Sequence, residues 1–150
     1  MDTNILTDQA KREALALLIL RVGLAWFLLV WGITKLLAPA HYGKLYAYFH
    51  GLDLDRMIVF AMGAGQILIA IAMILGLWRA VTYALGWLIH TVTIVIISGN
   101  LIAPFVIRDG FPSNRNQSIA LATWCGFTAL YLLRGRDLWS LDAWRSRRRT

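Results

Sequence analysis

The chain has 150 residues, of which 59% are hydrophobic and 15% are charged. Soluble domains are usually about 45–50% apolar and about 25% charged, so this composition argues against a soluble globular enzyme and against a disordered chain. The formal net charge is +7, but six of the fifteen basic residues lie after residue 133, beside apolar stretches, which favours anionic lipid head groups over nucleic acid as their partner.

Long stretches with few ionisable residues predict the membrane-spanning helices. The expected spans are residues 14–37, 57–78, 80–105 and 116–133. A helix needs about 20 apolar residues to cross a bilayer, so the last stretch is barely long enough. Continuous apolar runs favour helices over the alternating pattern of barrel strands. We therefore predict an all-α integral membrane four-helix bundle, with residues 1–150 forming one membrane domain.

The connections between the expected spans have their own patterns. Residues 41–52 place Tyr42, Leu45, Tyr46 and Phe49 at helical spacing, which predicts a short amphipathic interfacial helix between spans 1 and 2. Asp53 or Asp55 then caps the second span, and Ser113 or Asn116 caps the fourth. Two pairs of small residues predict close helix packing through the second span, although glycine is common in membrane helices anyway. These pairs are Ala61 with Gly65 and Ala72 with Gly76.

The distribution of basic residues predicts the orientation. Nine lie on the side of the chain termini and five on the other side, with Arg21 left out as intramembrane. Because basic residues concentrate in cytoplasmic segments, we expect a multi-pass protein of the inner (plasma) membrane with both termini in the cytoplasm. An even number of spans agrees with this. Residues 134–150 are expected to be a basic cytoplasmic tail that contacts lipid head groups or an acidic partner.

Three polar residues lie at similar depth in the expected spans, counted at about 1.5 Å per residue. They are Arg21, Gln66 and His90. Because polar groups inside a membrane mark functional sites, we predict that these side chains converge on one cavity that binds a quinone or a lipid head group. Arg21 and Gln66 can donate hydrogen bonds to a carbonyl, and His90 can pass a proton. In the alternative interpretation Arg21 snorkels to the surface, and Gln66 and His90 only join helices.

The sequence lacks the residues that other cofactors would need as ligands. His90 is the only histidine within an expected span, which argues against a bis-histidine haem and a metal site. The single cysteine, Cys125, excludes an internal disulfide and a cysteine-rich cluster, and we expect it to be a packing residue. No intrinsic cofactor is predicted, quinone is the one candidate ligand, and no catalytic residue can be assigned.

Three stretches resemble the DoxX family of small four-span membrane proteins. Residues 20–37 (LRVGLAWFLLVWGITKLL) are similar to the family's opening pattern, which maps to Arg21, Gly23, Gly32 and Lys35. Residues 63–80 (GAGQILIAIAMILGLWRA) are similar to its second span. Residues 135–144 (GRDLWSLDAW) are similar to its ending, which maps to Gly135, Ser140, Leu141 and Asp142. With the order of spans, the resemblance covers roughly residues 14–144.

This resemblance implies an accessory redox role, because the family has been linked to quinone-dependent sulfur oxidation and to membrane redox complexes that resist oxidative stress. The chain departs from the family at Gln66 and near Gln117, where the family often has glutamate. An amide cannot titrate, so a proton role at these positions is not carried over. Three interpretations stay open: an accessory subunit of a quinone-linked oxidoreductase complex, a purely structural subunit of a larger redox or respiratory complex, and a small oligomeric transporter. In the first two the partners are other membrane redox proteins or further copies of the chain.

Overall fold

Helices account for nearly all of the structure, a computed structural model that describes residues 3–103, 105–108, 111–112 and 117–148. The elements in chain order are α1 (Thr3–Leu37), α2 (Pro39–His50), α3 (Arg56–Leu75), α4 (Arg79–Ile96), α5 (Ser98–Ile102), β1 (Ile107–Arg108), β2 (Phe111–Pro112), α6 (Ser118–Leu132), the 3₁₀ turn η2 (Arg134–Arg136) and α7 (Leu141–Arg147). The predicted all-α bundle is confirmed. The only strands among the described residues are β1 and β2, which pair antiparallel over two residues each and were not predicted.

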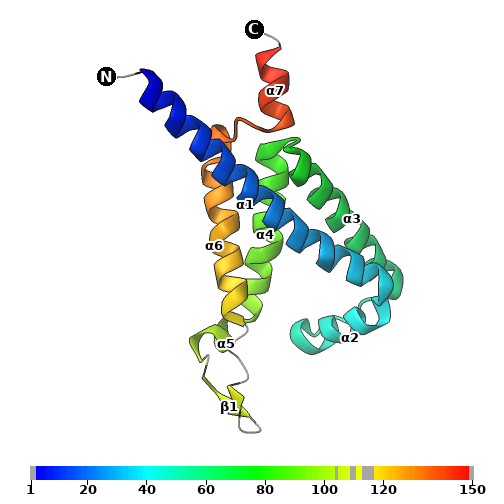
Figure 1. The fold of residues 1–150 in the computed structure, drawn as a ribbon. Helices are drawn as coiled ribbons and strands as arrows, with labels where there is room; N and C mark the ends of the chain where they lie inside the picture. The colour runs from blue at the N-terminus through cyan, green and yellow to red at the C-terminus, as the bar shows by residue number, and fades with distance from the viewer. Residues whose placement is uncertain (1–2, 104, 109–110, 113–116, 149–150) are drawn as a thin grey trace.

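The bundle consists of two antiparallel helix pairs (Figure 1). Helix α1 packs along α3, and α4 packs along α6. The two pairs meet at the end that carries both chain termini, which we call the terminal end, and they diverge toward the opposite end, where α2 and α5 lie. Because both termini lie at one end, the chain crosses the bundle an even number of times.

The helix lengths differ from two of the expected spans. Helices α1, α3 and α4 are long and apolar enough to cross a membrane, whereas α6, with 15 residues, is shorter. The third expected span, residues 80–105, is wrong beyond Ile96, because α4 ends there and α5 starts at Ser98. Ser98, Gly99 and Asn100 follow the break, and all three residue types disfavour a helix interior. The proposed caps Ser113 and Asn116 lie outside the described residues.

The predicted interfacial helix between the first two spans is α2. Its residues Tyr42, Leu45 and Tyr46 are half-buried, whereas Lys44 and Tyr48 on its other face are exposed, as the amphipathic pattern predicts. The Tyr42 hydroxyl lies 2.9 Å from the Thr34 hydroxyl, which ties α2 to the end of α1. Burial, and then the charge of neighbouring Tyr42, raise the pKa of Tyr46, so this side chain stays a neutral phenol.

The N-terminal cap of α3 is also as predicted. A carboxylate oxygen of Asp55 accepts from the backbone N–H of Met57 at 2.7 Å. This bond satisfies one of the free N–H groups at the start of the helix, which is the usual role of an aspartate there.

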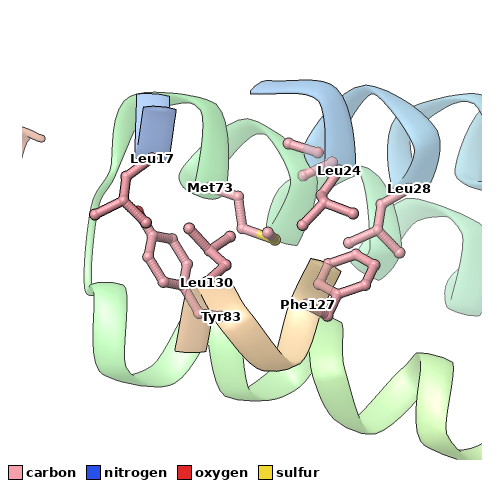
Figure 2. Close-up of a cluster of buried hydrophobic side chains, with 9 residues drawn as sticks. Leu17, Leu24, Leu28, Met73, Tyr83, Phe127 and Leu130 are labelled. Carbon is pink, nitrogen blue, oxygen red and sulfur yellow. The ribbon is translucent and has the colours of Figure 1, made fainter. Parts of the chain in front are cut away.

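The apolar core joins all four long helices near the terminal end. Leu24 and Leu28 of α1 lie near Phe127 of α6, and Met73 of α3 points into the same cluster beside Leu24 (Figure 2). Tyr83 of α4 is completely buried in the same cluster. Most other large apolar side chains point outward, which suits a bundle whose solvent is lipid.

Helices α1 and α3 approach each other closely at two glycines, Gly32 and Gly63. A methyl group built on Gly63 would lie 2.9 Å from the backbone oxygen of Gly32 and 2.9 Å from the Cβ of Lys35. The predicted pair of Ala61 and Gly65 is therefore wrong, since nothing lies within 4 Å of a Cβ at Gly65. The glycines that matter are those that face the neighbouring helix, as in other membrane helix pairs, and spacing alone does not identify them.

We expect Gly63→Ala to separate α1 from α3 and to lower the thermal stability of the purified protein. Gly65→Ala is the matched control: it adds the same methyl group to open space on the same helix, where alanine favours the helix by about 1 kcal/mol. Melting temperatures in detergent should therefore fall for Gly63→Ala and stay level or rise for Gly65→Ala. Equal melting temperatures for the two variants would contradict the close approach.

Candidate functional site

A buried ion pair joins the first helix to the C-terminal part of the chain. The Arg21 guanidinium donates to a carboxylate oxygen of Asp137 at 2.7 Å, and the two side chains are 2% and 0% exposed. The Tyr83 hydroxyl donates to the same oxygen at 2.6 Å. A second nitrogen of Arg21 donates to the Trp139 carbonyl at 3.2 Å. Arg21 therefore has its partners within the chain and does not snorkel to the surface.

The C-terminal segment folds back onto the turn between α3 and α4. We call residues 134–147 the C-terminal clasp. Both carboxylate oxygens of Asp142 accept backbone N–H bonds, from Trp78 at 3.1 Å and Arg79 at 2.8 Å, so Asp142 caps α4 from a distant part of the chain. Arg79 in turn donates to the carbonyls of Arg134 and Asp137. The residues expected to form a tail are thus packed on the bundle up to α7.

Gly76 makes the close contact of the clasp possible. It ends α3 in the left-handed conformation, at φ +64°, which glycine adopts without strain. A Cβ at this position would collide with Ser140 and with the Arg21 guanidinium. Gly76 therefore serves the turn and the clasp, and it does not pair α3 with another helix as the small-residue spacing suggested.

Gln66 belongs to a second polar contact, between α1 and α3. Its amide oxygen accepts from the Lys35 ammonium at 2.9 Å, and its amide nitrogen donates to the Leu28 carbonyl at 3.0 Å. Both side chains are buried, with Gln66 7% and Lys35 7% exposed. The Lys35 ammonium also lies 5.3 Å from the centre of the Tyr42 ring. In the described part of the chain, no carboxylate forms an ion pair with Lys35.

His90 lies in a third environment, between two phenylalanine rings. The ring centres of Phe27 on α1 and Phe127 on α6 are 5.3 and 5.5 Å from that of His90. The imidazole is 4% exposed. Its Nε2 atom is buried and has no hydrogen-bond partner. The amide oxygen of Gln117, next to the start of α6, is also buried without a partner.

The three predicted site residues are thus all buried but do not share hydrogen-bond partners. Gln66 binds the Leu28 carbonyl and His90 contacts Phe27, so these two lie at one level of α1. Arg21 lies six to seven residues earlier on α1, about 10 Å along the axis. Cys125, which was expected to be a packing residue, is exposed.

Three partners of the predicted site residues were not predicted from the sequence: Asp137, Tyr83 and Lys35. A signal for Asp137 was available, because a buried arginine needs a carboxylate and the apolar spans contain none. After Asp55 the chain has only three acidic residues, and two of them, Asp137 and Asp142, follow the last span. No group of three or more potential metal ligands occurs among the described residues.

We expect Arg21→Leu to destabilise the protein by about 3–5 kcal/mol, because it leaves the Asp137 carboxylate buried without its cation. Asp137→Leu should cost a similar amount, and the double variant should recover most of the loss. Thermal or denaturant unfolding in detergent measures this coupling. The control is Asp8→Asn, which breaks the exposed pair with Arg12 and should change stability by about 1 kcal/mol or less. Additive losses in the double variant would show that the pair does not act as a unit.

Comparisons with known proteins agree with the resemblance. The sequence profile of the DoxX family matches residues 16–99, which are more than half of the chain. The match includes Arg21, Lys35, Gln66 and His90 and ends before the C-terminal clasp. Searches of curated proteins and of solved structures gave no significant match. With this profile match and its bundle of long apolar helices, the chain belongs to the DoxX family and is a multi-pass membrane protein.

Proposed function

We propose that this DoxX-family protein is an accessory subunit of a quinone-linked oxidoreductase complex in the inner (plasma) membrane, and that it holds a quinol beside His90. The observation that carries this proposal is the buried Nε2 of His90, which has no hydrogen-bond partner; the amide oxygen of Gln117 is a second buried atom without one. Such atoms are costly to bury unless something binds them.

The hydrogen-bonding capacity of the two atoms suggests which form of the ligand fits. A neutral imidazole has one donor and one acceptor nitrogen, and in this proposal Nε2 is the acceptor. The Gln117 amide oxygen is an acceptor as well. The two hydroxyl groups of a quinol are donors, and its flat ring suits the neighbouring phenylalanines. On oxidation the quinol releases protons, which His90 is able to accept.

The expected contribution of Arg21 and Gln66 changes in this proposal. Both have partners within the chain, so in this proposal they hold helices together and do not bind the quinol. The same observation supports the second interpretation, a structural subunit that stabilises a larger redox complex, since satisfied polar contacts between helices stiffen a bundle. The transporter interpretation receives no support from the geometry.

Quinone content tests the proposal. The tagged protein, purified in mild detergent, should retain quinone in proportion to protein, and His90→Leu should lose most of it while still reaching the membrane. Leucine removes an unpaired buried polar atom, so this variant should fold normally. Thr93→Val, one turn along α4 at an exposed position, is the matched control and should retain quinone.

Mass spectrometry of the same preparations identifies the partner proteins. One outcome would favour the structural interpretation: neither preparation contains quinone, and the same redox subunits co-purify with the wild type and with His90→Leu. A preparation with neither quinone nor redox subunits would contradict both interpretations.

The proposed orientation, with both termini in the cytoplasm, rests on the excess of basic residues at the terminal end. In a Cys125→Ala background, Asp53→Cys in the exposed loop between α2 and α3 should react with an impermeant thiol reagent added to intact cells. Ser146→Cys, exposed on α7, should react only after the membrane is opened. The reverse pattern would place the termini outside.

A further inference from the structure

A cavity of about 450 Å³ lies at the terminal end of the bundle, between the end of α3 and the C-terminal clasp. Its walls combine apolar and cationic side chains. The apolar part includes Ile74, Leu75, Trp139 and Trp144, and the cationic part consists of Arg21 and Arg147. This volume lies within the range of small-ligand sites, about 300–1,000 Å³.

The two arginines of the cavity are held in place by the clasp. Arg21 is 2% exposed, and its Nε atom has no hydrogen-bond partner although its other nitrogens bind Asp137 and the Trp139 carbonyl. Arg147 donates to the carbonyls of Ala143 and Leu138, which fixes its guanidinium group beside the opening. The Arg21 guanidinium donates to Asp137, and both guanidinium groups line the cavity.

The surroundings of the cavity match the surface of a membrane. Trp139 and Trp144 are 48% and 45% exposed, and tryptophan is enriched where hydrocarbon meets head groups. The Arg148 guanidinium lies 3.7 Å from the centre of the Trp144 ring, which adds a further cation beside the opening. Residues 134–149 hold six arginines against two aspartates.

An apolar path leads from the cavity along the outside of α3. Leu75 lines the cavity, and Ile71 and Leu68 follow on the same helix face at spacings of four and three residues. All three are well exposed, with Leu68 at 69%. This stripe suits an acyl chain, whereas an acidic peptide would need polar partners along it.

We infer that the cavity binds one anionic phospholipid, with its phosphate beside Arg147 and Arg21 and an acyl chain along Leu75, Ile71 and Leu68. The lipid would fasten the C-terminal clasp to the membrane surface. This site is at the terminal end, separate from the environment of His90, so it does not depend on quinone binding.

Native mass spectrometry of the full chain tests the lipid site. Protein released from micelles doped with phosphatidylglycerol or phosphatidylcholine should retain the anionic lipid preferentially. Arg147→Gln should weaken phosphatidylglycerol retention about fivefold, the effect expected of one basic residue near an anionic surface. Arg145→Gln removes the same charge from an exposed position of α7 outside the cavity, and it should change retention less than twofold. Equal losses in the two variants, or no preference between the lipids, would overturn the site.

A second pair of variants tests the cavity without changing charge. Leu75→Trp should fill the cavity and reduce phosphatidylglycerol retention at least about fivefold, because the head group loses its space. Met62→Trp places the same ring at an exposed position of α3 that belongs neither to the cavity walls nor to the acyl-chain stripe, and it should leave head-group selectivity unchanged. Full retention of phosphatidylglycerol by Leu75→Trp would also overturn the proposal.

Discussion

The fold depends on the need to neutralise one arginine inside an apolar bundle. Arg21 lies on the longest helix, and a charge without a partner at the centre of a membrane costs at least about 2.5–3.5 kcal/mol. The chain provides Asp137, which comes 116 residues later, and the shared hydrogen bond of Tyr83 completes the contact. This single requirement brings α1, α4 and the C-terminal clasp to one place.

The three stretches that resemble the DoxX family meet physically at this contact. Arg21 comes from the first, Gly76 and Arg79 from the second, and Asp137 with Ser140 and Asp142 from the third. Gly76 leaves the space into which Ser140 and the guanidinium fit, and Asp142 caps α4 across the same turn. Stretches far apart in the sequence therefore act as one structural unit, although the family profile matches only residues 16–99.

Much of the architecture could be predicted from the sequence, because the physics of apolar runs is local. The charge-free runs indicated the helices, the spacing in residues 41–52 indicated α2, and Asp55 was recognised as a cap. The side-chain partners could not be predicted in this way. Depth along a helix placed Arg21 near Gln66 and His90, but depth does not show which face each residue occupies. Gly63 and Gly65 differ by two residues and about 200° around the helix, so one faces α1 and the other faces open space.

The polar residues of the bundle therefore divide into two kinds, and this division decides which variants can report on function. Two contacts fasten helices to each other, the first between Arg21 and Asp137 and the second between Lys35 and Gln66. The loss of either contact changes stability whatever the protein binds. The contact of Lys35 with Gln66 is weaker than the ion pair of Arg21 with Asp137, because an amide offers the cation a dipole and a carboxylate offers it a full charge. His90 differs from both, since its Nε2 holds no helix in place. A ligand that satisfies Nε2 adds an interaction that the folded chain alone lacks, so binding at His90 can be lost while the bundle stays intact.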